Sequence, residues 1–258
     1  MDNTSKYEIK VLQKTLNILN CFTSKKTEWS INEFCNELDL NRTTVYRILD
    51  ILKSYHYIEE SQKLGRYKLG KAYIAFGSIL LNEMNLKKIA SMYLESLANK
   101  IEETASLSIY YDFTSLILDS YDSPNDIKVH LDIGKRSELH ASSHGKIFLS
   151  NLSPTEFNKY FEKDLPQYTP MTHTNKDYFL KIIEKIRKNR VSYDREEVIN
   201  GLSGIGAPIL DYNSTIVGAI SIVGYSNRIE KKLDQLVEQV KLTASLISKE
   251  MGFSEEYE

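Results

Sequence analysis

Apolar residues near the start of the chain repeat every three or four positions, which predicts an amphipathic helix. After the polar segment SKKTEW, Ser30 precedes Glu33 by the spacing of a capping box, which marks the start of a helix. A second, short helix with the sequence INEFCNEL is therefore expected. The apolar positions of the first helix are Ile9, Leu12, Leu16 and Leu19.

A third helix is predicted in NRTTVYRILDILKSY, where Asn41 can cap the first turn. Tyr57 and Ile58 then begin a strand, residues 61–65 form a turn, and residues 66–69 alternate as a returning strand. Three short helices followed by a two-stranded hairpin are typical of a winged helix-turn-helix domain, whose recognition helix enters the major groove. The buried stripe of the third helix is predicted at Val45, Ile48, Leu49 and Leu52.

The exposed side of this third helix and the hairpin carry side chains that can bind DNA. Arginine donates to guanine or phosphate, and hydroxyl groups bind phosphate oxygens. Charge agrees, because residues 1–75 hold 12 Lys/Arg and 9 Asp/Glu, whereas residues 76–258 hold 21 and 26. A solvated helix face and a protein-binding winged helix are the alternatives. The predicted DNA-binding residues are Asn41, Arg42, Thr43, Thr44, Tyr46, Arg47, Lys63, Arg66 and Lys68.

Helical patterns continue through the middle of the chain. One helix is expected from about Lys71 to Asn85 and a second from about Leu86 to Glu103. The apolar stripe of the first belongs either to the core of one chain or to a dimer seam, and periodicity does not separate the two. Symmetric operators favour dimeric readers, which points to a homo-oligomer.

The remainder of the chain combines strands and helices. SLSIYYD, SLILDSYDS and DIKVHLDIG are three expected strands, with a tight turn near 113–115 between the first two. Helices are expected in HASSHGKIFLSNL, in SPTEFNKYFEK and over about 175–188. APILDYNSTIVGAISIVGY predicts a hairpin, and an amphipathic helix from about 229 to 247 closes the chain. Hairpins rather than βαβ units predict an α+β domain with a central antiparallel sheet.

The segment HASSHGK (140–146) resembles the parts of a catalytic centre. As a phosphate loop it lacks the first glycine and the final Ser/Thr, and GLSGIG (201–206) lacks the second glycine of a nucleophile elbow. His140 and His144 have the spacing of two zinc ligands, although Ala141 replaces the glutamate of H-E-x-x-H. A metal-dependent or serine hydrolase centred on His140–His144 stays as the alternative. The favoured interpretation is an anion-binding helix start, with Ser142 as cap and free N–H groups at Ser143, His144 and Gly145.

Three segments together resemble the IclR family of bacterial transcriptional regulators: NRTTVYRILDILKSYHYIEESQKLGRYKLG, LHASSHGK, and YDREEVINGLSGIGAPILD followed by AISIVG. The resemblance implies a winged helix-turn-helix domain over 1–70, a linker helix over 71–86 and a GAF-like effector-binding domain over 87–258. It also places an effector pocket at Asp194, Gly204, Ser221 and Val223.

The chain departs from the family pattern at four positions. His56 stands where the family usually has glycine, and His144 is larger and more polar than expected. Gly204 has no side chain where some relatives have a thiol, and Val223 replaces a serine. A ligand different from the small keto or aromatic acids of relatives is therefore compatible with the pocket.

These patterns predict a cytoplasmic, ligand-responsive regulator rather than an enzyme. Cys21 and Cys35 are expected to be free thiols, no apolar stretch is long enough to span a membrane, and the N-terminus lacks a signal-peptide pattern. We expect a homodimer or homotetramer that binds a palindromic double-stranded DNA operator and a small anionic effector, a carboxylate. No catalytic residue, metal or cofactor is expected. Effector identity and the choice between repressor and activator stay open.

Overall fold

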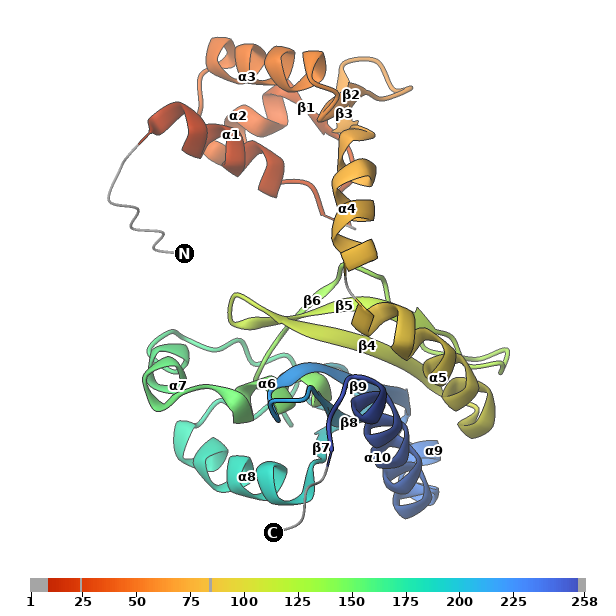
Figure 1. The fold of residues 1–258 in the computed structure, drawn as a ribbon. Helices are drawn as coiled ribbons and strands as arrows, with labels where there is room; N and C mark the ends of the chain where they lie inside the picture. Colours follow the sequence, from red (N-terminus) through yellow and green to blue (C-terminus); the bar gives the residue numbers. More distant parts are fainter. Residues whose placement is uncertain (1–8, 24, 84, 255–258) are drawn as a thin grey trace. The chain divides into compact units, whose positions relative to one another are not determined.

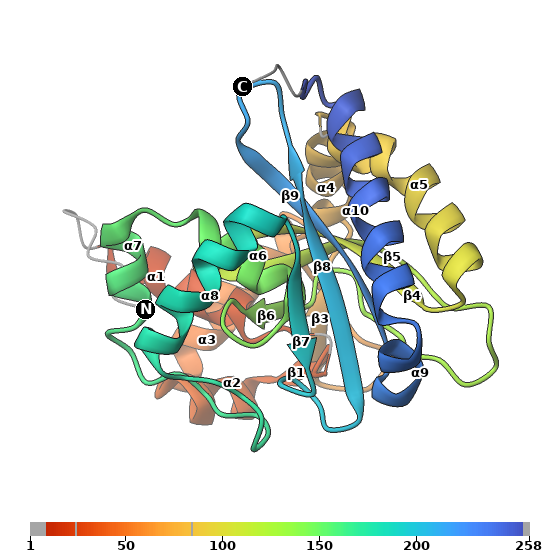
Figure 2. The ribbon, with the colours of Figure 1, turned by 90° about the horizontal axis from the view of Figure 1, so that it is seen from below.

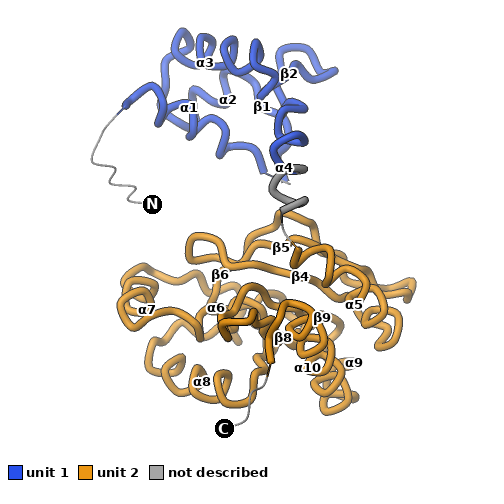
Figure 3. Tube along the Cα trace, in the orientation of Figure 1, with its two compact units in different colours: residues 1–83 blue, residues 84–258 orange. Residues whose placement is uncertain are grey.

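The computed structural model describes residues 9–23, 25–83 and 85–254. The chain divides into two compact units, residues 1–83 and residues 84–258 (Figure 3). The finer division into a DNA-binding domain (1–70), a linker helix (71–86) and an effector-binding domain (87–258) stays a prediction. In the described part of the chain, every helix is too short or too polar to cross a membrane.

The first unit is a winged helix-turn-helix, as predicted (Figure 1). Three helices are followed by a hairpin, and the hairpin is joined by a two-residue strand that the apolar pattern did not reveal. The sheet order is β1-β3-β2, with both pairings antiparallel. The elements are α1 (Lys10–Asn20), β1 (Trp29–Ser30), α2 (Ile31–Leu38), α3 (Arg42–Ser54), β2 (Ile58–Glu60), β3 (Arg66–Leu69) and α4 (Ala72–Glu83).

Local hydrogen bonds start α2 and α3 where the sequence indicated. The Ser30 hydroxyl accepts from Glu33 N–H while the Glu33 carboxylate accepts from Ser30 N–H, so the capping box is formed. The Asn41 side chain accepts from Thr44 N–H at 2.8 Å. The predicted stripe of α3 is buried against Phe34 and Trp29, whose rings stack at 5.2 Å.

Helix α1 forms as expected, but most of its apolar stripe is not covered by the first unit. Ile9, Leu12 and Leu16 are 56%, 51% and 50% exposed, whereas Ile18 is fully buried. The buried face of this helix therefore lies beside the stripe that the spacing emphasised. These three large apolar side chains are left at the surface of the first unit.

The backbone at His56, where the family usually has glycine, has a conformation that glycine favours. Its φ is +62°, a left-handed conformation that glycine adopts without strain and that costs another residue about 1 kcal/mol. Gly70 packs against the same turn, since a Cβ there would lie 2.1 Å from the His56 carbonyl oxygen. The turn thus keeps the geometry that a glycine would favour, while a histidine occupies it.

The second unit is an α+β domain built on one antiparallel sheet of order β6-β5-β4-β9-β8-β7 (Figure 1). Its strands are β4 (Thr104–Tyr111), β5 (Thr114–Tyr121), β6 (Arg136–Glu138), β7 (Ser192–Arg195), β8 (Leu202–Leu210) and β9 (Ile216–Tyr225). Its helices are α5 (Asn85–Ile101), α6 (Ser143–Asn151), α7 (Pro154–Tyr160), α8 (Lys176–Asn189), α9 (Ser226–Lys231) and α10 (Leu233–Glu250).

The two faces of this sheet pack against different helices. Helices α5 and α10 lie side by side on one face (Figure 2), where they form an apolar core with alternate residues of β4, β8 and β9. Helix α6 packs on the opposite face and joins α7 and α8 in a second apolar cluster. The second face carries small and polar side chains near the start of α6, and this is where the predicted effector residues lie.

Three details of the second unit differ from the sequence prediction. DIKVHLDIG is not a strand; β6 begins only at Arg136, while Val129 and Leu131 line a cavity instead of pairing with a neighbour. Strand β7 was not predicted, because SYDR has no apolar alternation. The closing helix is divided at Lys232 into α9 and α10.

The turn between β4 and β5 lies slightly earlier than expected. Asp112 and Phe113 both have positive φ, +44° and +57°, as a two-residue hairpin turn of the I′ kind requires.

Candidate functional site

The N-terminal half of α3 presents the predicted DNA-binding side chains. Asn41, Arg42, Thr43, Tyr46 and Arg47 are exposed, and Thr44, whose N–H donates to the Asn41 cap, is half-buried. The Arg42 guanidinium donates to the Asn32 side chain at 2.6 Å, which links the recognition helix to the preceding helix. The remaining guanidinium N–H groups of Arg42 stay available to a partner.

The basic residues of the hairpin are held by acidic neighbours. Lys63 lies 3.5 Å from Glu28, and Lys68 lies 3.0 Å from Glu59. Arg66 donates to the Glu28 carbonyl and to the Glu33 carboxylate, both at 3.2 Å. We therefore expect these three cations to contribute less to DNA affinity than the arginines of α3.

HASSHGK forms the start of α6, with Ser142 as its N-cap. The Ser142 hydroxyl accepts from Gly145 N–H at 3.2 Å. The Gly145 N–H was expected to be free for a ligand, and that prediction is wrong. A Cβ at Gly145 would lie 2.6 Å from the same hydroxyl oxygen and 2.8 Å from the Glu138 carbonyl. Gly145 is thus required for packing and does not line the cavity, whereas Ser143 and His144 do.

Two glycines of β8 let the start of α6 approach the sheet. A Cβ at Gly204 would lie 3.0 Å from Ser143 Oγ, and one at Gly206 would lie 3.0 Å from the Ser143 carbonyl. A hydrogen bond also joins the start of α6 to β7, because the Ser192 hydroxyl donates to the Ser143 carbonyl at 2.5 Å. The strand sequence GLSGIGAPIL therefore makes room for the helix.

The two histidines of the motif point to different surroundings. His140 is fully buried, with Nδ1 2.9 Å from the Tyr160 hydroxyl and Nε2 3.0 Å from the Pro166 carbonyl. Both ring nitrogens of His140 are thus satisfied by the protein. Among the described residues, no three His, Cys, Asp or Glu side chains are grouped as metal ligands. The zinc-site alternative has no geometric support.

A cavity of about 70 Å³ lies between the start of α6 and the sheet. Seven of the eight predicted effector residues line it, the exception being Gly145. Sequence reasoning missed the other lining residues, which come from β5, from β6 and the connection before it, and from the start of β8 and the loop before it. The full lining is Ile117, Val129, Leu131, Lys135, Ser137, Ser142, Ser143, His144, Asp194, Val198, Ile199, Leu202, Gly204, Ser221 and Val223.

The polar side of this cavity contains an imidazole held by a serine pair. His144 is 7% exposed, and its Nδ1 lies 3.3 Å from Ser221 Oγ, which in turn lies 3.0 Å from Ser106 Oγ. His144 Nε2 is buried and has no hydrogen-bond partner among the described residues. Burial lowers the pKa of His144 to about 4, and the positive charge of Lys135 adds to this effect. The ring is therefore neutral at physiological pH.

Acidic and basic groups lie behind the cavity. The ammonium group of Lys146 donates to the Glu197 carboxylate and, at 2.7 Å, to the Tyr193 carbonyl. Asp194 accepts from Glu197 N–H at 2.8 Å. Burial raises the pKa of Asp194 to about 7, although Lys146 opposes the shift. The Asp194 carboxyl group is therefore divided between its neutral and charged forms near neutral pH.

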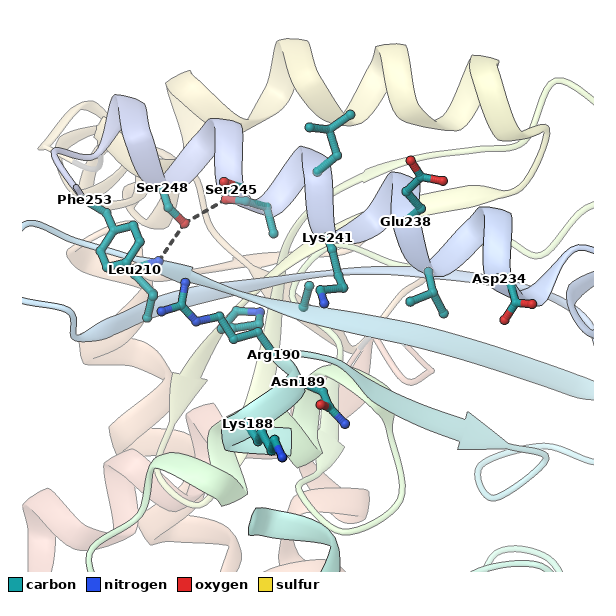
Figure 4. A pocket seen from close by; sticks show the side chains of 15 residues that line it. Lys188, Asn189, Arg190, Leu210, Asp234, Glu238, Lys241, Ser245, Ser248 and Phe253 are labelled. Carbon is teal, nitrogen blue, oxygen red and sulfur yellow. Dashed lines mark hydrogen bonds between the residues drawn. The ribbon is translucent and has the colours of Figure 1, made fainter. Parts of the chain in front are cut away.

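A second, larger hollow of about 810 Å³ lies between the end of α8, strand β8 and helix α10 (Figure 4). Its charged lining includes Lys188, Lys241, Asp234 and Glu238. The buried Ser248 hydroxyl in this hollow is already satisfied, since it accepts from Leu210 N–H and donates to the Ala244 carbonyl. The hollow contains none of the predicted site residues.

Comparison with known proteins agrees with this architecture. Residues 11–61 match the model of the IclR helix-turn-helix domain, and residues 79–249 match that of the bacterial transcriptional regulator IclR C-terminal domain. The KipR regulator of Bacillus subtilis (strain 168) is 26% identical over 247 residues, which cover 95% of this chain and 98% of the relative. The repressor AllR of Escherichia coli (strain K12) is 26% identical over 245 residues, covering 93% and 90%.

Solved structures show the same fold. A regulator from Silicibacter sp. TM1040 superposes with a TM-score of 0.85 at 18% identity, covering 95% of this chain and 97% of the other. An IclR homolog from Microbacterium hydrocarbonoxydans, complexed with 4-hydroxybenzoate, superposes with a TM-score of 0.82 at 19% identity, covering 94% and 99%.

The two units define a transcriptional regulator with a helix-turn-helix domain and an effector domain. The chain belongs to the IclR family, because the two family models together match most of its length. The relatives are regulators and not enzymes, so the hydrolase alternative has no support.

Proposed function

We propose that the protein binds a palindromic operator as a homo-oligomer in the cytoplasm and that a small anionic metabolite alters this binding. The observation that carries the effector part is the cavity, which is polar on one side and is lined by His144, whose buried Nε2 has no hydrogen-bond partner among the described residues. A ligand changes the DNA-bound population only through different affinities for the two states of the regulator.

The operator part rests on α3. Two exposed arginines and two threonines lie on its first two turns, where recognition helices contact base edges and phosphates. The exposed apolar residues Ile9, Leu12 and Leu16, at the start of α1 and along it, support a second copy of the chain as a neighbour, since the first unit leaves them uncovered.

Alanine substitution of Arg42 and Arg47 tests operator recognition. Each base-reading arginine should contribute about 1–3 kcal/mol, so the double variant should bind its operator at least about 30-fold more weakly in a fluorescence-anisotropy titration. Lys63→Ala and Lys68→Ala are the controls and should have smaller effects, because both ammonium groups are already paired. Unchanged operator affinity in the double arginine variant would show that α3 is not the recognition helix.

The effector part predicts a ligand of limited size. The cavity of about 70 Å³ is small compared with common ligand pockets, so we expect a small effector. Lys135 supplies positive charge at the exposed side, and Asp194 can donate a proton when it is neutral. These groups favour a carboxylic acid, and the small cavity favours a short-chain one.

Thermal-shift titrations with acetate, glycolate and lactate test this proposal. A bound acid should raise Tm with concentration, because it stabilises only the folded protein. The shift should be smaller in Lys135→Ala, and smaller at pH 8 than at pH 6, because deprotonation of Asp194 places a second negative charge beside the ligand. Equal Tm shifts at both pH values would show that the Asp194 carboxyl group does not affect acid binding.

A further inference from the structure

The imidazole of His144 has two nitrogens with different surroundings. His144 lines the cavity, and its Nδ1 lies 3.3 Å from Ser221 Oγ on the sheet, with Nε2 on the opposite edge of the ring. Nε2 is buried and lacks a partner in the described part of the chain. A buried polar atom left without a hydrogen bond costs about 1–3 kcal/mol, which is a cost that a bound ligand can remove.

Counting hydrogens in the serine pair indicates which nitrogen carries the proton. If Ser106 donates to Ser221 and Ser221 donates to His144 Nδ1, each hydroxyl hydrogen is used once. In the opposite direction, Nδ1–H donates to Ser221 and Ser221 donates to Ser106. The Ser106 hydrogen then has no acceptor among the described residues, although Ser106 is fully buried. The first arrangement is favoured, and it places the proton on Nε2.

We propose that His144 is a specificity-determining residue of the cavity: its Nε2–H donates to an acceptor oxygen of the effector, and the Ser106–Ser221 pair holds the ring in the tautomer that does so. This inference rests on the proposed effector function. The ring supplies a directional donor without a net charge, so it favours a ligand with a carboxylate or carbonyl oxygen at that point over one with a methyl or ammonium group. Lys135 and Asp194 are the charged or titratable groups that line the same cavity.

The first test needs no ligand. The chain contains five histidines, so full-length protein labelled with 15N-histidine gives few ring signals, and His144→Gln assigns the relevant one. We expect His144 at pH 7 to show a protonated Nε2 and an unprotonated Nδ1. A proton on Nδ1, or on both nitrogens, would overturn the donor assignment whichever acids bind.

The second test separates this inference from the effector proposal. Glycolate is titrated into wild type, His144→Gln and His144→Phe, with circular dichroism and the urea unfolding midpoint as the check that each variant is folded. Glutamine keeps a donor, whereas phenylalanine fills the site without one. We expect the phenylalanine variant to bind glycolate about three- to tenfold more weakly, the range that one hydrogen bond supplies, and the glutamine variant to stay closer to wild type.

Equal glycolate affinity in wild type and His144→Phe would overturn the role of His144 while leaving the effector proposal standing. If wild type binds none of acetate, glycolate and lactate, the effector proposal fails and this inference fails with it.

Discussion

The two faces of the sheet in the second unit are built from alternate residues of the same strands, yet they are chemically opposite. On one face, Leu107, Ile205, Ile220 and Ile222 contact α5 and α10 in a dry apolar core. On the other, Ser106 lies opposite Ser221, which lies opposite Gly206 under the start of α6. Because neighbouring residues of a strand point to opposite faces, one strand serves both purposes.

The two faces separate stability from ligand recognition. The apolar face excludes water and stabilises the unit by burial. The small, polar face forms fewer apolar contacts, but it admits α6 and leaves a cavity with hydroxyl groups at its wall. Substitutions on the first face should therefore change mainly the free energy of unfolding, and those on the second mainly ligand binding.

The adjacent residues Ile222 and Val223 give the most direct test of this separation, with the largest expected effect. Ile222 is fully buried in the apolar core, whereas Val223 is half-buried and lines the cavity. Ile222→Ala should lower the free energy of unfolding by about 2–5 kcal/mol in urea denaturation. Val223→Ala should lower it by less than about 1 kcal/mol, since part of its surface already faces open space. Similar losses in the two variants would show that both faces contribute equally to stability.

The features that sequence predicted well are those set by nearby residues. The caps at Ser30, Asn41 and Ser142 involve partners three positions away, so their spacing is visible in the chain. The hairpin of β8 and β9 was also predictable from its long apolar runs. The resemblance to the family added Asp194, Gly204, Ser221 and Val223, which no local pattern singled out and which the fold brings to one cavity.

The features that sequence did not predict depend on distant partners. Val129 and Leu131 alternate like strand residues, but alternation reports one buried side and does not show that a neighbouring strand is present. Strand β7 exists because β8 pairs with it, although its own residues are mixed. Lys135 carries no motif at all and reaches the cavity only through the path of the loop before β6.

Acidification should lower the free energy of unfolding through His144, which lies on the polar face. Its folded-state pKa of about 4 lies below the ordinary value of 6.5, so the unfolded chain binds the proton first as pH falls. The free energy of unfolding should fall by about 1.4 kcal/mol for each pH unit below 6.5, so the total loss near pH 4 should be roughly 3 kcal/mol. Urea denaturation of wild type and His144→Gln between pH 7 and pH 5 measures this contribution, because other groups affect both proteins alike. Parallel pH dependences would mean that the ring is protonated within the fold.

The smallest effect concerns the two glycines under α6, and it divides the polar face itself. At Gly206 an added Cβ would lie 3.0 Å from the backbone of Ser143 and 2.9 Å from Ser192 Oγ. Backbone atoms cannot rotate away, so Gly206→Ala should push α6 outward and destabilise the protein by about 1–3 kcal/mol.

At Gly204 the side-chain contact is Ser143 Oγ, which can change rotamer, but the Ile222 carbonyl lies equally close. Gly204→Ala should therefore cost less stability than Gly206→Ala, while its methyl group takes up room in the cavity and weakens acid binding. Paired urea denaturation and thermal-shift titrations check both variants. If Gly204→Ala lost stability as Gly206→Ala does and bound acids normally, Gly204 would serve packing and not the cavity.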